Sequence, residues 1–358
     1  MANIKDVAKA AGVSPITVSR VFNHPELVSE ETIEAVKKAA EALSYTPNLL
    51  ARGLVTNKTQ TIGVFFSRLE NPLYSACLSG ITEQAAAVGY NVLIAYADTV
   101  EDSIKAIQVL LSRQIDGLII MGIDFRAEDD NGFNHTILDE INRFYNQFNK
   151  IAERCYQQGF PIICMSQMDG NDITNCAGHV AHDYASGSLM AVQYLSQNGH
   201  KKIGYLAHVI TDHGIWGIRY RAFFDAINKY NCETRPEWVC LSTDTVDGGF
   251  HSMKQLLQQK ELPTAIYCAN DEIAVGAINA CHANGVRVPD DISIIGHDGS
   301  SIGLFSYPKL TTVSIRYKEM GTECVNLLIE VMKDKQFSHT SKFMRPILVE
   351  RESVKSII

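Results

Sequence analysis

The stretch that decides the fold runs from residue 14 to residue 23 and reads SPITVSRVFN. It predicts a short helix, because Ser14 can accept a free N–H group of the first turn and Pro15 needs no N–H there. One narrow face is apolar and would pack on neighbouring helices; it consists of Val18, Val21 and Phe22. The remaining side chains would point outward, and they are Ile16, Thr17, Ser19, Arg20 and Asn23.

Two further short helices are expected to flank this one. Asn3 and Asp6 have the spacing of a capping box at the start of the first helix, and Gly12 would end it. Ser29 is placed to cap the third. The apolar stripes of the two helices are Ile4, Val7, Ala8 and Ala11, and then Ile33, Val36, Ala40 and Leu43. Three short helices with a tight turn after the first predict a helix-turn-helix unit over residues 1–46.

The outward face of residues 15–23 has two interpretations. Hydroxyl, amide and guanidinium groups are the groups that reach base edges and phosphates when a helix enters the major groove. A solvated polar face is the more common explanation for an arbitrary helix. The tight turn, the caps and the segment that follows favour DNA binding here. Charge adds little, since the chain carries a net charge of −8 while residues 1–60 hold seven Lys/Arg and six Asp/Glu.

Residues 47–60 connect this unit to the rest of the chain. Pro47 ends the third helix, and Asn48 can cap one more short turn that continues through Leu54. A helix this short is unstable alone, and Gly53 weakens it by about 1 kcal/mol. Leu50 and Leu54 would project from one side. The segment is either an ordinary linker with two docking leucines or a hinge that orders on DNA and inserts an apolar wedge into the minor groove.

From residue 61 onward, strand-like apolar runs alternate with helical stretches, which predicts an α/β core of parallel sheets covered on both faces. The runs are TIGVFF, NVLIAYA, GLIIMGI, PIICMS, KIGYLA, WVCLST, AIYCAN and ISIIGHD. A second series opens after about residue 202, so we expect two similar lobes within residues 61–358. The predicted lobes are roughly 61–170 with 299–315, and 171–298 with 316–358.

Ligands of such sheets bind beyond the carboxyl ends of the strands. Polar and aromatic side chains just past predicted strand ends are therefore candidate contacts for a small polar molecule. Forked carboxylate, amide and guanidinium groups suit vicinal hydroxyls, and aromatic rings suit the apolar faces of a sugar. The candidates are Ser67, Arg68, Asn71, Tyr74, Asp124, Ser166, Trp216, Arg219, Asn270, His297 and Asp298.

Other kinds of chemistry find little support in the sequence. No apolar run of about 18 residues indicates a membrane span, and the first residues lack a secretory signal, so we expect a cytoplasmic protein. Nine cysteines without a CxxC pair favour buried reduced thiols over disulfides or a zinc site. His179 and His182 lack further metal ligands nearby, and a structural or surface role is expected for them. No nucleotide fingerprint or nucleophile–base pair occurs, so neither a cofactor nor an enzyme is predicted.

Several segments, in order, resemble the LacI/GalR family of bacterial transcription regulators. The match includes IKDVAKAAGVSPITVSRVFN, VSEETIEAVKKAAEALSYTPN, LARGL, IDGLIIMG, NGHKKIGYLA, PTAIYCANDEIAVGAINACHANGVRVPDDISIIGHDG and PKLTTVSI, and it covers nearly the whole chain. The resemblance implies a pseudo-palindromic operator read by a homodimer, with a CpG step expected at its centre. It also implies a core similar to periplasmic sugar-binding proteins, with the effector between the lobes.

The resemblance assigns roles to residues by their place in these motifs. The positions that meet operator bases would be Ser14, Pro15, Ile16, Thr17, Ser19, Arg20 and Asn23, with Pro15 and Ile16 at places that vary with the operator. Phosphates or the hinge region would be held by Asn3, Lys5, Ser29, Thr32, Tyr45 and Asn48, and Leu54 would be the wedge with Ala51 as its companion. Arg219, Asn270 and Asp298 match ligand-holding positions of the family, and Asn71, Tyr74 and Asp124 match sugar contacts of the periplasmic relatives.

Two rival functions remain open at this point, a solute-binding protein that serves a transporter and an α/β enzyme. The first would have no use for residues 1–60, and the second needs a reactive group in the cleft. The chain also departs from the family pattern: Ile315 stands where many relatives have Gln, and the segment after Asp124 is unusually long, with a helix predicted from about Ile137.

Overall fold

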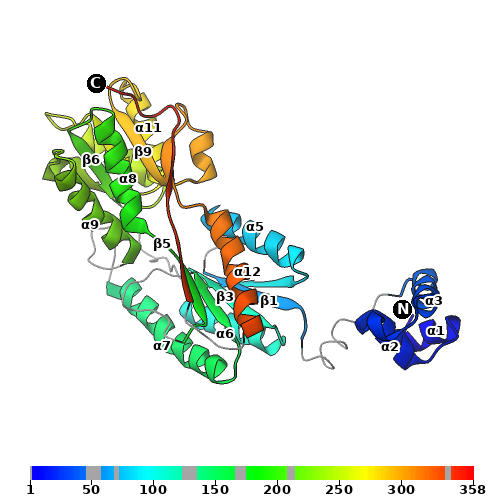
Figure 1. Ribbon diagram of the computed structural model, residues 1–358. Coiled ribbons are helices and arrows are strands. Elements are labelled where there is room, and N and C mark those ends of the chain that lie inside the picture. The colour runs from blue at the N-terminus through cyan, green and yellow to red at the C-terminus, as the bar shows by residue number, and fades with distance from the viewer. Residues whose placement is uncertain are drawn as a thin grey trace. The chain divides into compact units, whose positions relative to one another are not determined.

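The computed structural model describes residues 2–45, 58–67, 72–122, 135–165, 175–207, 214–334 and 340–358. The chain divides into two compact units, and each is described by itself. The first contains the three short helices near the N-terminus, and the second contains two six-stranded sheets with their helices (Figure 1). No helix in the described ranges has the length and apolar character needed to cross a membrane.

The first unit is a helix-turn-helix arrangement, as predicted. Its elements are α1 (Ile4–Ala10), α2 (Pro15–Asn23), the short 3-10 helix η1 (Pro25–Leu27) and α3 (Glu30–Ala42). Asn3 and Asp6 form the predicted capping box, and the Ser14 hydroxyl accepts a bond from the Thr17 N–H at 3.1 Å. A small core holds the helices together; its buried residues are Val7, Ala8, Val18, Val21, Val36 and Ala40.

The third helix differs from the prediction at both ends. Ser29 occupies the N-cap position, but its hydroxyl bonds to the Thr32 hydroxyl at 2.9 Å and makes no capping bond to the backbone. Leu43 was expected in the apolar stripe, yet 38% of it is exposed. It lies at the C-cap, past the last helical turn, where the 3.6-residue periodicity no longer governs which side a residue faces.

The core contains the two similar lobes that the sequence predicts. The first sheet has the order β11-β5-β4-β3-β1-β2 and the second β12-β10-β9-β8-β6-β7, so both place their strands in the same pattern. The pairs β1–β3, β3–β4, β4–β5, β5–β11, β6–β7, β6–β8, β8–β9 and β9–β10 are parallel, whereas β10 and β12 are antiparallel. The strands of the first sheet are β1 (Thr61–Phe66), β2 (Asn91–Tyr96), β3 (Gly117–Met121), β4 (Ile162–Met165), β5 (Gly178–His182) and β11 (Thr340–Met344). Those of the second are β6 (Ile203–Ala207), β7 (Val239–Leu241), β8 (Ala265–Cys268), β9 (Ser293–Asp298), β10 (Thr311–Ser314) and β12 (Ile347–Val349).

Helices cover the sheets in packed pairs. In the first lobe α5 lies against α12 and α6 against α7; in the second, α8 lies against α9 and α10 against α11 (Figure 1). Their bounds are α5 (Pro72–Ala87), α6 (Val100–Ser112), α7 (His135–Gln157), α8 (Tyr184–Gln197), α9 (Gly214–Lys229), α10 (Val246–Leu256), α11 (Asp271–Ala283) and α12 (Tyr317–Asp334). Two short 3-10 helices, η2 (Pro236–Trp238) and η3 (Ser301–Leu304), complete the second lobe.

The predicted points at which the chain changes lobe were wrong. The β5 strand (178–182) belongs to the first sheet and not to the second lobe, and so do α12 and β11. Conversely, residues 311–314 form β10 of the second sheet. The chain therefore crosses after β5, after β10 and between β11 and β12. Both sheets have the same order and similar apolar strands, so a strand's sequence alone does not say which of the two it joins.

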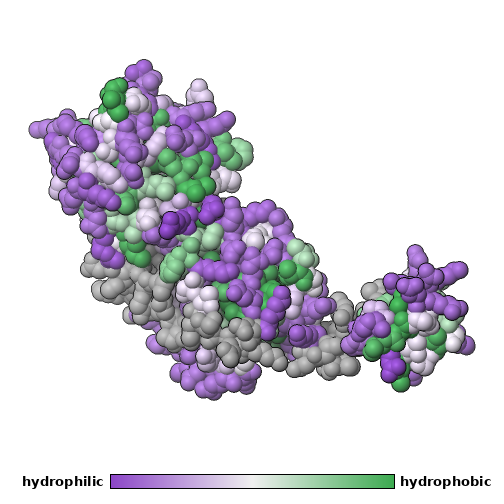
Figure 2. Space-filling view, viewed as in Figure 1, coloured by the Kyte–Doolittle hydropathy of each residue, from purple (hydrophilic) through white to green (hydrophobic). Residues whose placement is uncertain are grey.

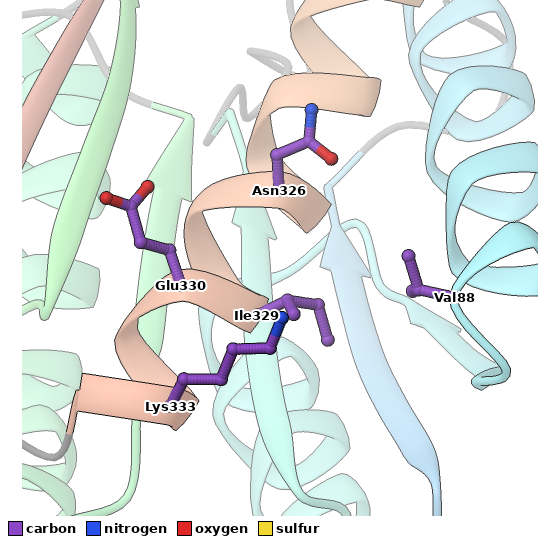
Figure 3. A pocket seen from close by; sticks show the side chains of 5 residues that line it. All are labelled: Val88, Asn326, Ile329, Glu330 and Lys333. Carbon is purple, nitrogen blue, oxygen red and sulfur yellow. The ribbon is translucent and has the colours of Figure 1, made fainter.

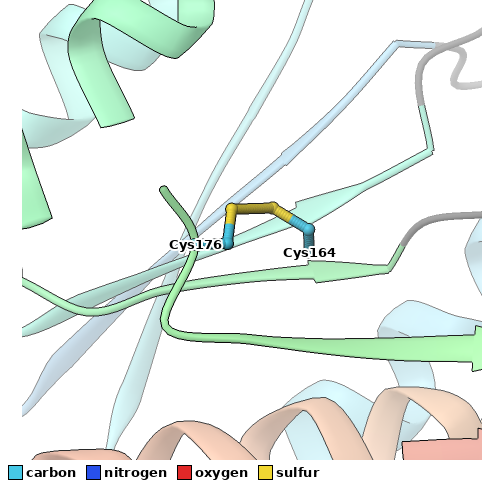
Figure 4. The surroundings of a disulfide bond; sticks show 2 residues. All are labelled: Cys164 and Cys176. Atoms are coloured by element: carbon cyan, nitrogen blue, oxygen red, sulfur yellow. A yellow bond between two sulfur atoms is a disulfide. The ribbon is translucent and has the colours of Figure 1, made fainter. Parts of the chain in front are cut away.

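The expectation that all nine cysteines are reduced was also wrong at one pair. Cys164 of β4 and Cys176 just before β5 are joined by a disulfide (Figure 4). The two residues are twelve apart in sequence, and both are buried where neighbouring strands of the first sheet run side by side. The other seven cysteines are free. Pairing depends on which strands become neighbours, and cysteine spacing carries no such information.

Two glycines allow α5 and α12 to approach closely. A Cβ at Gly80 would collide with the Lys318 carbonyl, and a Cβ at Gly321 would collide with the Cys77 carbonyl. We therefore predict that Gly80→Ala lowers the free energy of unfolding of the core by about 1–3 kcal/mol, because the backbones must separate. Urea denaturation followed by circular dichroism measures this. Ala76→Ser, at an exposed position of α5, is the control, and an equal loss in both variants would contradict the prediction.

Candidate functional site

The outer face of α2 is the candidate DNA-reading surface. Val18 and Val21 are buried, whereas 66% of the Ile16 side chain is exposed and Arg20 is exposed. Asn23 donates a hydrogen bond from Nδ2 to the Ser19 hydroxyl at 3.1 Å, which orients both groups along the same face. The Ser14 and Thr17 hydroxyls lie 2.9 Å apart at the start of the helix. The helix thus presents polar groups and one exposed isoleucine beside an apolar seam.

The residues expected to hold phosphates surround this helix. Asn3 and Lys5 are exposed at the capped start of α1. Ser29 is exposed at the N-terminus of α3, which has no side-chain capping bond, and Thr32 is half-buried in the first turn of that helix. The N-terminus of a helix favours an anion. Tyr45 packs its ring near Phe22, with ring centroids 6.1 Å apart, which fixes it against the base of α2. Three further predicted DNA contacts, Asn48, Ala51 and Leu54, lie outside the described residues.

In the core, the strand order reverses between β1 and β3 and again between β6 and β8. Crevices at such reversal points hold the ligands of doubly wound sheets. The predicted effector residues that the structure describes come from these places and from neighbouring strand ends. Four of the candidates, Arg68, Asn71, Asp124 and Ser166, lie outside the described residues, and so does the side chain of Trp216.

The centre of the described site is an ion pair between Arg219 of α9 and Asp298 at the end of β9. Nη2 of Arg219 lies 2.5 Å from Oδ1 of Asp298, and Nη1 donates to the Ala269 carbonyl at 2.5 Å. Only 1% of Arg219 and 5% of Asp298 is exposed. Asp298 has a φ of 101°, a backbone conformation that L residues rarely adopt. Such strain is held in place by surrounding structure and is concentrated at functional sites.

Burial sets the electrostatics of this pair. Desolvation raises the pKa of Asp298, and the Arg219 charge acts in the opposite direction. Desolvation lowers the pKa of Arg219, but the charge of Asp298 and the nearby tyrosines outweigh that effect and raise it above the ordinary value. The guanidinium therefore has a fixed orientation, because both of its Nη atoms donate within the protein.

The first lobe contributes Ser67 and Tyr74 near the ends of β1 and β3. The Ser67 hydroxyl donates to the Gly122 carbonyl at 3.3 Å. Tyr74 is buried against Phe66, and a Cβ at Gly122 would lie 2.8 Å from its hydroxyl oxygen. Both residues therefore lie at the carboxyl end of the same strand pair, as the sequence predicts.

Two candidate effector residues, Asn270 and His297, make their contacts within the second lobe itself. Asn270 caps α11, and its Oδ1 accepts the Ile273 N–H at 2.7 Å. His297 is fully buried, with Nδ1 2.6 Å from the Tyr267 hydroxyl, and a Cβ at Gly187 of α8 would lie 2.6 Å from its Cε1 atom. The prediction that His297 contacts the effector is therefore corrected to a core position. Consecutive residues of a strand face opposite sides, so Asp298 turns toward Arg219 while His297 packs under α8.

Three residues that the sequence did not place near the candidate site lie at the crossings between lobes: His182, Tyr184 and Tyr317. Arg219 lies over the Tyr184 ring at 5.1 Å. Burial raises the pKa of Tyr184 to about 12, and Tyr317 acts in the opposite direction. The His182 ring is 4.9 Å from that of Tyr184. Burial, followed by the Arg219 charge, lowers the pKa of His182 to about 3, so its ring is neutral near pH 7. The sequence signal would have been the aromatic residues Tyr184 and Tyr317 just after the first two crossings, but the crossings were misplaced.

A surface groove of about 560 Å³ lies away from these residues, between α12 and the end of α5. Figure 3 shows Asn326, Ile329, Glu330 and Lys333 of α12 along one side and Val88 opposite. None of the predicted effector residues that the structure describes lines it. In the described ranges, no group of three or more His, Cys, Asp or Glu side chains is placed to hold a metal ion.

Comparisons with known proteins agree with this geometry. Residues 3–48 match the model of bacterial regulatory proteins of the lacI family, and residues 192–354 match a periplasmic binding protein-like domain. The chain is 33% identical over 358 residues to the HTH-type transcriptional repressor PurR of Pasteurella multocida, covering 99% of each protein. It is also 33% identical to PurR of Haemophilus influenzae over the full length of both.

Solved structures show the same architecture over nearly the whole chain. A Lac repressor bound to ONPG in the repressed state matches with a TM-score of 0.79 and 26% identity, covering 99% of both chains. The complex of the regulator CelR with cellobiose matches with a TM-score of 0.65 and 24% identity, which indicates the fold. With a helix-turn-helix unit joined to a two-lobed core, this chain belongs to the lacI family of bacterial regulatory proteins and is a DNA-binding transcriptional repressor, not an enzyme.

Proposed function

We propose that this repressor reads a pseudo-palindromic operator as a homodimer and that a small carbohydrate effector controls its affinity for DNA. The observation that carries the proposal is the outer face of α2. It presents the exposed Ile16 and the hydrogen-bonded Ser19 and Asn23, while Val18 and Val21 on the other face are buried. A helix of this kind fits the major groove. Because its partner is the bacterial chromosome, the protein would act in the cytoplasm.

Base reading is assigned to α2 and phosphate contact to the helix ends around it. In this proposal Arg20, Thr17 and Ser19 reach base edges, and Ile16 contacts a thymine methyl, because its side chain has no hydrogen-bonding group. Selection from a randomised duplex library identifies the operator. We expect two inverted half-sites about a central CpG step, and enrichment of sequences without inverted symmetry would contradict the dimeric arrangement.

Exposed apolar side chains support the second copy as a partner. In the second lobe, Phe305 and Tyr307 are 85% and 84% exposed, and Leu304 of η3 is 48% exposed. In the first lobe, the edge strand β2 exposes Leu93, Ile94 and Tyr96. Figure 2 shows mostly hydrophilic residues on the visible face, interrupted by smaller hydrophobic areas on both lobes. Exposed aromatic residues of this size mark association surfaces.

The effector class follows from the Arg219–Asp298 pair and the tyrosines near it. Buried charged forks with fixed geometry bind the hydroxyl groups of a polar ring, and aromatic rings cover its apolar face. Two relatives support a sugar: the Lac repressor structure contains ONPG, and an Escherichia coli regulator described as sugar-binding is 25% identical with a TM-score of 0.65. Binding of effector and of DNA would be linked, so each changes the affinity for the other by the same factor.

Replacing Ile16 tests the assignment of α2. We expect Ile16→Ala to reduce discrimination at one operator base pair by about 1–2 kcal/mol, because the apolar contact with the base is lost. Leu27→Ala is the matched control, since Leu27 is equally exposed (66%) but lies in η1. Fluorescence anisotropy with single-base operator variants measures the difference. Equal behaviour of the two variants would remove α2 from base reading.

Charged substitutions test the dimer surface. The double variant Phe305→Asp, Tyr307→Asp is expected to be monomeric in sedimentation velocity. Its affinity for the operator should fall by about 100-fold, because the two helix-turn-helix units are no longer linked. Leu241→Asp alters another exposed apolar residue of the second lobe and should leave the dimer intact. A double variant that remains dimeric would place the interface elsewhere.

Ligand screening tests the effector site. We expect one of a panel of mono- and disaccharides and sugar phosphates to raise the melting temperature by several degrees. Arg219→Lys should weaken that ligand at least about tenfold, because an ammonium group cannot reproduce the two-pronged donor. Arg287→Lys, in the exposed pair with Asp291, is the control. Stabilisation by planar nucleobases and not by sugars would contradict the carbohydrate assignment.

A further inference from the structure

Asp116 holds the stretch of chain that enters the core. Its Oδ1 accepts the Thr59 N–H at 2.8 Å and the Thr59 hydroxyl at 3.1 Å, and its Oδ2 accepts the Gln60 N–H at 2.8 Å. The Asp116 N–H in turn donates to the Thr61 carbonyl at 2.8 Å. One carboxylate therefore accepts two backbone N–H groups from consecutive residues and shares the single Thr59 hydroxyl hydrogen with the Gln114 carbonyl. Residues 114–116 belong with residues 1–61 to the first compact unit.

The backbone on both sides of this contact is in an unusual conformation. Gln60 has a φ of 51° and Gln114 a φ of 55°, and the Gln114 carbonyl accepts the Thr59 hydroxyl at 2.8 Å. Non-glycine residues in the left-handed region cost free energy and persist where other contacts compensate for them. The hydrogen bonds to Asp116 and Gln114 supply that compensation. The linker is therefore held in one shape where it meets the core.

The same two strands connect this contact to the candidate effector site. The β1 strand begins at Thr61, pairs in parallel with β3 from Gly117 onward, and is followed directly by Ser67. The carboxyl ends of β1 and β3 are joined again where the Ser67 hydroxyl donates to the Gly122 carbonyl. Both ends of one rigid strand pair are thus fixed by polar side chains. The hydrogen bonds at Asp116 tie residues 59–61 to the chain just before β3.

We propose that Asp116 is the positioning residue through which the first lobe controls the DNA-binding unit. It clamps Thr59 and Gln60, so the hinge segment before them starts from a fixed point when it meets the operator. Without the clamp, two residues in each of two chains would regain backbone freedom, and DNA binding would have to order them. The inference rests on the proposed function, because it concerns binding of operator DNA by the full chain.

Asp116→Asn is the test variant, since it keeps the shape of the side chain but replaces one acceptor oxygen with a donor amide. Its matched control is Asp98→Asn, an exposed carboxylate on the same lobe, which removes the same charge. Loss of a negative charge alone favours DNA binding. We expect Asp98→Asn to bind operator as well as the unsubstituted chain or slightly better, and Asp116→Asn to bind at least about tenfold more weakly.

Three measurements on the full-length chains separate positioning from a merely structural role. Hydrogen exchange of the Thr59 and Gln60 amides should be slow in the unsubstituted chain and at least about tenfold faster in Asp116→Asn. The dependence of operator affinity on salt should keep its slope, because the phosphate contacts are unchanged. Thr59→Val, which removes only the hydroxyl bonds, should give an intermediate loss of operator affinity.

Operator affinity equal to that of Asp98→Asn would overturn the proposal, even if Asp116→Asn melts at a lower temperature. Rapid exchange of both amides in the unsubstituted chain would also overturn it, because no clamp would exist. If no chain binds any duplex, the proposed function fails and this role fails with it. Slow exchange in the unsubstituted chain and fast exchange in Asp116→Asn would then show that the clamp itself is real, which separates the two failures.

Discussion

The parallel direction of the strands is the constraint on which the rest of this structure depends. Parallel strands have all their amino ends at one edge of the sheet and all their carboxyl ends at the other. In the first lobe, β1 and β3 therefore begin beside the linker and end beside Ser67 and Tyr74. This separation places Thr59 and Gln60 at one end of the strand pair and the proposed effector contacts at the other. Asp116 and the Ser67–Gly122 bond fix the two ends of the same strand pair.

The buried pair of Arg219 and Asp298 fixes two charged side chains at the end of β9. Breaking a buried ion pair leaves an unpaired charge and costs about 3–5 kcal/mol, so the two side chains hold each other in place. Tyr184 lies under the guanidinium at 5.1 Å and follows the first crossing between lobes. The pair is therefore in contact with the segment at which the chain first crosses between the lobes. A ligand that contacts Arg219 would act on that segment directly.

The two units differ in how strongly local sequence dictates their structure. In the first unit, Asn3, Asp6 and Ser14 make their predicted capping bonds, because a cap depends only on residues within one helical turn. Leu43 and Ser29 depart from the prediction at helix ends, where that local control weakens. In the core, each apolar run formed a strand, yet Asn270 turned out to cap a helix and His297 to pack under α8. The residue after a strand is fixed by sequence, but the direction of its side chain is set by neighbouring elements.

By itself, the sequence determined the helix-turn-helix unit, the apolar strands of the α/β core and the family to which the motifs belong. These features depend on periodicity, caps and short motifs, all of which act over a few residues. Only the tertiary structure decided where the chain crosses between lobes, that Cys164 pairs with Cys176, and that Tyr184 lies beneath Arg219. Each of these depends on which distant segments become neighbours. The two sheets have the same strand order and similar apolar strands. Side-chain packing therefore determines which sheet each of the strands β5, β10, β11 and β12 joins.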